Sequence, residues 1–567
     1  MRQQPDNSKN LVTAMLLSLA VVLGWQYFVA GPKLREEQAR IQRDKQIEAE
    51  RTAKTGPSAG SAPLPSGVTA PGVPAPTAGT ATPGTLAPST TAMTRDAAIA
   101  ASPRLAIKTP SLEGSIDLKG AHVDDLRLVR YHDTVDPKSA NVVLFSPLEA
   151  PEPYFAEYGW LPQGTTQPLP TADTVWKADK EGAVLTPSTP VTLTWDNGQG
   201  LVFHRTISID NDYMLKVLDE VENQSQAPVT LAPYGRIYRL GKPHVQGFAI
   251  LHEGLIGVPG EAGLQEFAFA DAVKENLNKV FDKTTGGWLG VTEKYWASAL
   301  IPGQADTYKA TFGARKAVTA AEKDVYYTDY VLQGLTVPPS GRKGAATSLY
   351  AGAKQVSIID GYEKSMGIKR FDRMIDWGWF YFITKPLFYI LEKLNAHLHN
   401  FGLSILALTL LVKAAFFPLA NKSYESMAKM KKLQPQVEAL RERYKDDKAR
   451  QQQEMMTLYG KEKINPAAGC LPILLQIPVF FALYKVLFVT IDMRHAPFFG
   501  WIKDLSAPDP TTIFNLFGLI PWTPPEFFHV GAWALIMGVT MWLQMQLNPP
   551  QPDPVQQQVF ALMPVIF

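Results

Sequence analysis

The stretch FGLSILALTLLVKAAFFPL, from Phe401 to Leu419, is apolar almost throughout and contains one charged residue, Lys413. Its 19 residues suit a helix that crosses the ~30 Å hydrocarbon core of a bilayer. A lysine at such a depth costs ~2.5–3.5 kcal/mol on insertion scales, so it normally faces protein, water or a transport path. Snorkelling of the long side chain toward the headgroups is the alternative interpretation. The pattern therefore predicts a membrane span with a cation inside it.

The composition places this span in a chain of two or three domains. The 567 residues carry a net charge of +2, so there is no general nucleic-acid footprint and no specific nucleic-acid site is expected. The single cysteine, Cys470, excludes an intrachain disulfide and the usual multi-cysteine zinc and iron–sulfur patterns. No cofactor and no metal are expected.

The N-terminal residues predict a second membrane segment and a tether. Leu11–Ala30 contains no charge and ends in the aromatic residues Trp25, Tyr27 and Phe28. This run is longer than the apolar region of a cleaved signal peptide, which is the competing interpretation. We therefore predict an uncleaved anchor over residues 1–31. Residues 32–95, a charged segment followed by an Ala, Pro, Thr and Gly-rich stretch, are predicted to be a disordered tether.

Residues 96–355 have the texture of an antiparallel β-sandwich. Val191–Ile209 alternates between apolar and polar residues on either side of Asn197-Gly198, a hairpin signal. No P-loop, HExxH or GxSxG motif occurs in this part of the sequence. A scaffold or binding role is therefore favoured over catalysis, and the chain is not expected to be an enzyme. Further strands are predicted at Tyr213–Val221, Thr230–Leu240, Ala310–Phe312 and Val325–Leu332.

The C-terminal part predicts an α-helical membrane core with a helical hairpin. An amphipathic helix over residues 380–400 is expected to lie on the membrane surface, unless it is simply the last helix of the β-sandwich domain. The core is predicted over residues 401–567, with further C-terminal spans missing from it. Its parts are spans at about 401–420, 470–491 and 530–547, the start of another at 559, and the hairpin at 421–464.

The hairpin is strongly basic. Asn421–Lys463 contains 11 Lys and Arg against 7 Asp and Glu, and Asp446-Asp447 marks a break between two helices. A solvated charged face is one interpretation; a docking arm for anionic lipid, ribosomal RNA or partner proteins is the functional one. The residues expected to dock are Tyr424, Met427, Lys429, Met430, Lys431, Lys432, Arg441 and Arg443.

The distribution of basic residues predicts the orientation. Short loops rich in Lys and Arg stay in the cytoplasm, and Asp492–Val530 has only two such residues against the 11 of the hairpin. The hairpin and the N-terminus are therefore expected inside. The β domain is expected outside, which is the periplasm in a Gram-negative cell.

Each predicted span carries polar residues at helical spacing. Thr409 and Lys413 share one face of the first span, Gln476 lies on the second, and Thr540 and Gln544 share a face of the third. These groups could simply hydrogen-bond between helices. If the faces converge, they would line a wet groove that holds one positive charge.

The run from Leu403 to Phe567 resembles the YidC family of membrane-protein insertases, and the anchor, tether and β domain resemble its Gram-negative branch. The resemblance implies a periplasmic β-supersandwich and a five-helix core whose hydrophilic groove opens to cytoplasm and lipid. It also implies insertion and folding of nascent inner-membrane proteins, both alone and beside the Sec translocon with its accessory subunits. The matching residues are Pro418-Leu419, Tyr424, Ser426 to Met430, Gln434-Pro435, Asn465-Pro466, Gly469-Cys470, Pro472, Gln476, Pro478, Phe480, Leu483-Tyr484 and Met563-Pro564.

This resemblance suggests a mechanism and partners. The groove would attract the polar tail of a substrate to Lys413, while its apolar segment slides into lipid along Ile477, Pro478, Val479 and Phe480. Ribosomes and targeting factors would dock on the hairpin. Family members usually have arginine where this sequence has Lys413, and an ammonium is a point charge rather than a planar fork.

Two other classes of function remain open from the residues alone. A secondary transporter could use Lys413 as an ion site, although three complete spans and no inverted repeat disfavour it. A membrane-anchored periplasmic carbohydrate-binding or chaperone protein would place its function in the β domain. Deletion of residues 96–350 would distinguish an insertase from this last class. An insertase core should keep most of its activity, whereas a protein that acts through its β domain should lose it.

Overall fold

The computed structural model describes residues 93–243, 251–319, 322–462, 471–520, 522, 530–547, 561–562 and 564, with backbone only for Met427, Lys448, Leu471, Pro472, Ile473 and Gly518. The chain divides into two units: one holds Glu425–Gly469 with Met1–Gly79, the other Thr80–Tyr424 with Cys470–Phe567. The predicted anchor, nearly all of the tether, the motifs Asn465-Pro466 and Gly469-Cys470, and Met563 lie outside the described residues.

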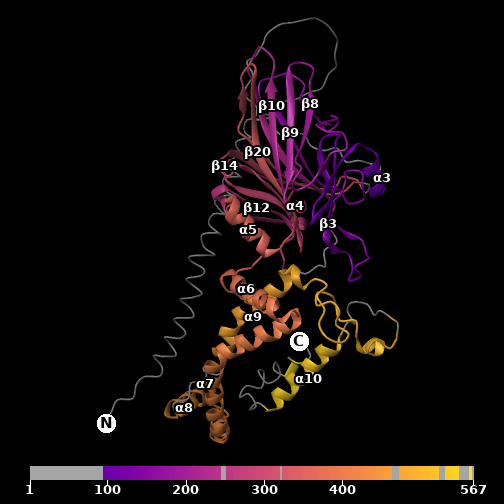
Figure 1. The fold of residues 1–567 in the computed structure, drawn as a ribbon. Coiled ribbons are helices and arrows are strands. Elements are labelled where there is room, and N and C mark those ends of the chain that lie inside the picture. The colour runs from indigo at the N-terminus through magenta and orange to yellow at the C-terminus, as the bar shows by residue number, and fades with distance from the viewer. Residues whose placement is uncertain are drawn as a thin grey trace, which may run out of the picture. The chain divides into compact units, whose positions relative to one another are not determined.

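Two large sheets form the β domain, which occupies the upper part of Figure 1. One sheet has eleven strands in the order β14-β17-β18-β11-β5-β3-β2-β1-β7, with β19 beside β11 and β4 beside β3. The other has nine, in the order β13-β12-β15-β16-β20-β10-β9-β8-β6. Within the described chain the strand pairs are antiparallel apart from β1 with β7. The predicted antiparallel β-sandwich is therefore present.

The strands of the eleven-stranded sheet are β1 (Arg104–Lys108), β2 (Leu112–Asp117), β3 (His122–His132), β4 (Asn141–Phe145), β5 (Tyr154–Pro162), β7 (Val184–Leu185), β11 (Val229–Leu240), β14 (Asn278–Thr285), β17 (Thr307–Arg315), β18 (Val325–Leu332) and β19 (Leu335–Val337). Those of the nine-stranded sheet are β6 (Lys177–Ala178), β8 (Val191–Asp196), β9 (Leu201–Ile209), β10 (Met214–Asn223), β12 (Gly254–Pro259), β13 (Gln265–Ala268), β15 (Gly287–Thr292), β16 (Trp296–Ile301) and β20 (Gly341–Ala353).

The hairpin predicted from Val191–Ile209 is formed by β8 and β9. Along β9 every second residue from Leu201 to Ile209 is buried, which is the alternation expected of a strand with one face in the core. The side-chain oxygen of Asn197 accepts hydrogen bonds from the backbone N–H groups of Gln199 and Leu201, at 2.8 and 3.0 Å. The turn is thus longer than the two residues Asn197-Gly198, because the Asn side chain organises a four-residue loop.

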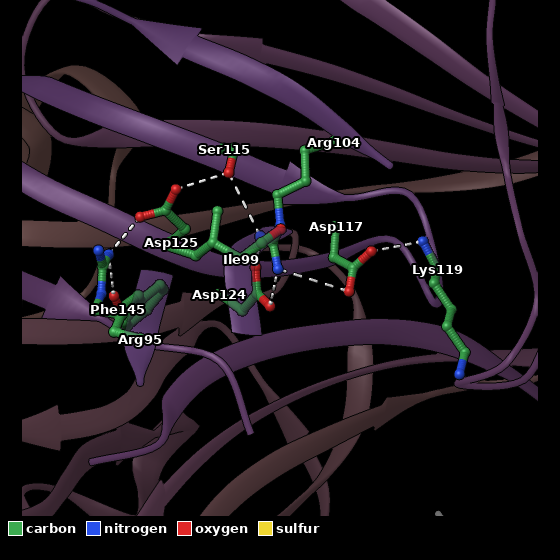
Figure 2. A network of polar contacts seen from close by, with 9 residues as sticks. All are labelled: Arg95, Ile99, Arg104, Ser115, Asp117, Lys119, Asp124, Asp125 and Phe145. Atoms are coloured by element: carbon green, nitrogen blue, oxygen red, sulfur yellow. Dashed lines mark hydrogen bonds and ion pairs between the residues drawn. The ribbon is translucent and has the colours of Figure 1, made fainter. Parts of the chain in front are cut away.

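A network of ion pairs fixes the start of the β domain to the first strands (Figure 2). Both Nη atoms of Arg104 contact the two carboxylate oxygens of Asp124, at 2.6 and 3.1 Å, and its Nε donates to the carbonyl of Ile99 at 3.0 Å. Arg95 pairs with Asp125. Burial raises the pKa of Asp124 to about 6, although the Arg104 guanidinium opposes this. These contacts hold helix α3 (Arg95–Ala100) against the sheet.

The helices follow the sheets along the chain. α5 (Val356–Met366) and the short η3 (Phe371–Met374) connect the β domain to α6 (Tyr381–Leu398). The remaining elements are α4 (Phe269–Lys274), α7 (Phe401–Arg443), α8 (Lys448–Lys461), α9 (Leu471–Val489), α10 (Ala532–Leu547), η2 (Gly260–Ala262), η5 (Ile491–Met493) and η6 (Ile513–Gly518).

The predicted first span and the first hairpin helix form one continuous helix, α7. The sequence has no glycine between Gly402 and Gly460, so no glycine interrupts the helix after the apolar run. The helix ends at Arg443, and α8 begins after Asp447, whose side chain accepts a hydrogen bond from the N–H of Arg450 at 3.0 Å. This cap explains why the break falls at the two aspartates.

Glu157 makes the stability of the β domain dependent on pH. Burial raises its pKa to about 7, although nearby Arg236 opposes this. The carboxyl therefore binds a proton more tightly in the folded than in the unfolded chain. The stability that this bound proton contributes is lost as pH rises from about 4.5 to 7. We compare the free energy of unfolding of Glu157→Gln with that of the wild type. Between pH 4.5 and pH 8 we expect this difference to shift in favour of the variant by up to about 3 kcal/mol.

Urea unfolding of both proteins at the two pH values measures this difference. His122 lies 3.9 Å from Glu157, but burial lowers its pKa to about 4, so it is neutral over most of the window. His122 also affects the pH dependence of each protein, and the comparison between wild type and variant removes most of that effect. If the two proteins differ in free energy of unfolding by the same amount at pH 4.5 and at pH 8, the raised pKa of Glu157 is contradicted.

Candidate functional site

Helix α7 carries the candidate cation. Lys413 is exposed, and within the described chain no hydrogen bond or ion pair to it is found. Thr409, one turn earlier, is half-buried, and its hydroxyl donates to the carbonyl of Ile405 at 2.8 Å. Thr409 is uncharged, so it does not neutralise Lys413, and its hydroxyl is directed to the backbone of its own helix.

The surroundings of Lys413 on α7 are apolar and exposed. Leu410, Leu411 and Phe417 all have more than half of their surface exposed, whereas Leu408 is buried in the core. Of the described helices, α7 is the one that is both long and apolar enough to cross a membrane. Leu474–Val489 of α9 and Ala532–Leu547 of α10 are shorter apolar helices. The cation thus sits on an apolar surface that water alone would solvate poorly.

The residues predicted for the second span divide between two environments along α9. Gln476, Ile477 and Phe480 are exposed, while Pro478 and Val479 are half-buried. Beyond them, α9 packs against α6 and buries Ala482 and Val486. The first half of α9 is therefore the part that remains available to a substrate.

On α10, Thr540 and Gln544 are both exposed. The hydroxyl of Thr540 donates to the carbonyl of Met537 at 2.9 Å, again within its own helix. Across the part of the chain described, no polar contact joins these two residues to Thr409, Lys413 or Gln476. The structure places the five predicted groove residues on three exposed helix faces, and their convergence into one groove stays a prediction.

The hairpin residues lie on α7 and α8. Tyr424, Lys431, Lys432 and Arg443 are exposed, Met430 and Arg441 are half-buried, and the side chain of Met427 is not described. Lys429 pairs with Glu425 at 2.9 Å, one helical turn away. Leu433 and Val437 are buried, as the helical stripe predicts. The arm therefore combines an apolar side with an exposed basic side.

A buried ion pair that the sequence analysis missed fixes α9 to the segment after the β domain. The Nζ of Lys485 lies 2.6 Å from Oδ2 of Asp376, and both side chains are largely buried. Burial alone would raise the pKa of Asp376, but Lys485 and the N–H groups of His252 and Gly378 bring it below its ordinary value. Lys485, like Lys413, is a charged residue inside an otherwise apolar run of the sequence. This pattern is sufficient to predict Lys485 as a residue with a buried or functional partner.

We expect Lys485→Met to loosen this anchor. The substitution keeps the apolar stem and leaves the buried Asp376 carboxylate with backbone donors alone, which costs up to about 3–5 kcal/mol. Amide hydrogen exchange in residues 371–378 of the full chain should become roughly 100-fold faster. Lys503→Met, in the exposed loop after α9, is the matched control. Equal protection in both variants would show that the pair does not anchor α9.

A polar cavity of about 310 Å³ lies where the loop after α9 meets the β domain. Arg494 lines it, donates to the carbonyl of His132 at 2.6 Å and stacks over Trp296. Lys294, on the turn between β15 and β16, lies 4.3 Å from the ring of Phe488 at the end of α9. None of the predicted groove residues lines this cavity, so these contacts serve the connection between sheet and helix.

Comparison with known proteins gives a consistent result over most of the chain. Residues 104–390 match the YidC periplasmic domain, and residues 393–567 match the family described as the 60Kd inner membrane protein. A protein of Methylobacterium nodulans named membrane protein insertase YidC is 52% identical over an alignment of 570 positions, which covers 99% of this chain and 90% of that protein. A protein of the same name from Rhizobium etli is 48% identical, over 99% of this chain and 90% of its own length.

Solved structures give a much weaker likeness. A galactose mutarotase related enzyme of Lactobacillus acidophilus is 10% identical, with a TM-score of 0.31, over 44% of this chain and 97% of that one. A likeness of this size says nothing about activity. The relatives found by sequence are therefore the comparison that bears on function.

Proposed function

The chain belongs to the YidC family of membrane protein insertases, and on that premise we propose how its own residues insert a nascent segment. It is an insertase of inner-membrane proteins, and nascent membrane proteins are its substrates. Its β domain is the periplasmic domain of the family.

We infer a topology in which α7, α9 and α10 cross the membrane and α6 lies in its periplasmic interface. The N-terminal anchor and the hairpin of α7 and α8 then place the chain's N-terminus and its basic arm in the cytoplasm. Two features support this arrangement: the excess of Lys and Arg in residues 421–463, and the exposed apolar surfaces of the three helices. Nothing in this topology requires a nucleotide site.

We propose that Lys413 is the electrostatic centre of a hydrophilic groove completed by Thr409, Gln476, Thr540 and Gln544. The acidic or polar tail of a substrate would be drawn to the ammonium from the cytoplasmic side. The polar tail of the substrate then has a shorter distance of hydrocarbon left to cross. Because an acidic residue at the bilayer centre costs ~2.5–3.5 kcal/mol, an opposite charge there lowers the barrier to its passage.

The apolar segment of the substrate would meanwhile leave the groove along α9. Ile477 and Phe480 offer exposed apolar side chains, and Pro478 and Val479 lie beside them. The transfer is driven by burial of apolar groups in hydrocarbon, at ~0.8 kcal/mol per CH₂. The protein itself contributes the path, and the substrate contributes the free energy.

We further propose that the hairpin receives ribosomes and targeting factors, and that the insertase works both alone and with the Sec translocon. The exposed basic residues of α7 and the buried stripe of Leu433 and Val437 support a stable arm with one charged face. Anionic lipid would contact the same face, because basic segments near a membrane are attracted to its negative surface.

The observation that carries the proposal is an exposed lysine inside the apolar run of α7, with no neutralising neighbour among the residues the structure describes. Site-specific photo-crosslinking from positions 409, 413 and 480 to a stalled nascent chain tests it. We expect the tail of the substrate to crosslink to 409 and 413 and its apolar segment to 480. A nascent chain that crosslinks to none of these positions, although it inserts, would refute the groove.

A further inference from the structure

The loop between α9 and α10 has its apolar side chains outside. Phe499 and Trp501 are about half exposed, and Leu519 is 83% exposed. Leu516, Phe517, Ile520 and Trp522 are exposed in the same way. A soluble protein rarely displays so many large apolar side chains on one short segment.

Three polar side chains beside these apolar ones are inside. Thr511, Thr512 and Asn515 are all buried. The Thr512 hydroxyl and the Asn515 side chain each accept a hydrogen bond from the other's backbone N–H, at 3.2 and 2.9 Å. The Asn515 amide also donates to the carbonyl of Pro510 at 2.9 Å. Buried polar groups that satisfy each other, beneath an apolar exterior, are what an apolar solvent requires.

The backbone holds this arrangement against a local preference. Leu516 and Phe517 both have positive φ, at 49° and 56°, which bulky residues rarely adopt. Two backbone hydrogen bonds close the loop around them, from Phe517 N–H to the Thr512 carbonyl at 2.8 Å and from Ile520 N–H to the Asn515 carbonyl at 3.1 Å. These bonds keep both side chains pointing outward.

The position and charge of the loop identify what covers it. The sequence has no charged residue between Asp509 and Trp522, and Trp522 is of a type that gathers at membrane interfaces. An isolated bridge pairs Thr512 with Gly531, the residue before α10 begins. If α10 crosses the bilayer, its first turn lies at the interface, and the loop lies at the same level.

We propose that residues 511–520 and Trp522 dip into the outer leaflet of the membrane and anchor the periplasmic end of α10 in lipid. This inference rests on the proposed topology, in which α7 and α10 are spans. The occupant is lipid rather than a protein surface, because the Thr512–Gly531 bridge places the loop beside the start of α10, where Trp533, Ile536 and Met537 are exposed as well. We expect the loop to reach ~5–10 Å below the headgroups, as interfacial apolar segments do.

Spin labels on single cysteines in a Cys470→Ser background test the proposal in the full chain. Leu519→Cys reports on the loop, Val318→Cys on an exposed loop of the β domain, and Leu410→Cys on the middle of the apolar run in α7. The chain is placed in nanodiscs at one copy per disc. Collision with oxygen, which concentrates in lipid, is then compared with collision with a water-soluble nickel chelate.

We expect the Leu519 label to meet oxygen several-fold more often relative to nickel than the Val318 label, at a depth shallower than that of Leu410. Equal nickel access at Leu519 and Val318, with Leu410 protected, would overturn the inference and leave the topology intact. Nickel access at Leu410 as well would overturn both. Protection of Leu519 only in a second preparation with several chains per disc would assign the loop to a second copy and refute the lipid contact.

Discussion

Replacement of Lys413 by alanine is expected to slow the insertion of substrates with acidic tails about tenfold or more, and to affect neutral tails much less. An acidic residue costs ~2.5–3.5 kcal/mol at the bilayer centre, and a cation that offsets half of this changes the rate by about that factor. Insertion into proteoliposomes, followed by protease protection of the translocated tail, measures the rate for a matched pair of substrates.

Two variants control this experiment. Lys413→Arg keeps the charge and should retain most of the activity, because attraction of a carboxylate needs a cation rather than one particular donor geometry. Lys422→Ala removes an exposed lysine of the same helix beyond the apolar run, and should not distinguish acidic from neutral tails. Equal slowing of both substrates by Lys413→Ala would contradict the electrostatic role. Complete loss of activity in Lys413→Arg would point to chemistry specific to the ammonium.

Arg205→Met is expected to destabilise the β domain by about 3–5 kcal/mol. Arg205 and Asp219 face each other across β9 and β10, and Nε and Nη2 of Arg205 contact the two carboxylate oxygens at 2.6 and 3.2 Å. The guanidinium also stacks over Trp176 and Tyr158. Burial already raises the pKa of Asp219 although Arg205 opposes it, so loss of the arginine leaves a buried carboxylate without its cation.

The double variant Arg205→Met/Asp219→Leu should recover most of that stability, because apolar residues can replace a buried ion pair at little cost. Urea unfolding of the β domain in the full chain, followed by tryptophan fluorescence, compares the three proteins. A double variant that is as unstable as Arg205→Met would show that packing of the guanidinium, rather than its charge, stabilises this site.

The parts of the fold that could be predicted are those determined by local patterns. Alternation of apolar residues and the turn at Asn197 were enough to predict β8 and β9, and β18 covers the predicted Val325–Leu332. The same reasoning located the break before α8, because Asp447 is a good helix cap. The continuity of α7 was not predicted: the span was expected to end at about residue 420 and the hairpin to start at 421, whereas the helix runs through this boundary to Arg443.

Features that depend on distant residues could not be read from the sequence. Lys485 and Asp376 are 109 residues apart, so neither predicts the other. The inverted loop of Thr512 and Asn515 was also hidden, because an apolar run looks the same whether its side chains face a core or lipid. The candidate groove has the same limit: spacing places Thr409 with Lys413 on one helix face, but it cannot show which faces of other helices meet them.

Water access to α7 tests the central claim most directly. Single cysteines at Thr409, Lys413, Ala407 and Leu411, in a Cys470→Ser background, are treated in proteoliposomes with a thiol reagent that cannot cross the membrane. Because positions 407 and 411 lie on the face of the helix opposite to Thr409 and Lys413, a hydrated groove predicts that cysteines at 409 and 413 react from the cytoplasmic side, while those at 407 and 411 do not. Protection of 409 to the same degree as 407 and 411 would mean that no water reaches beyond Lys413, and would contradict the groove.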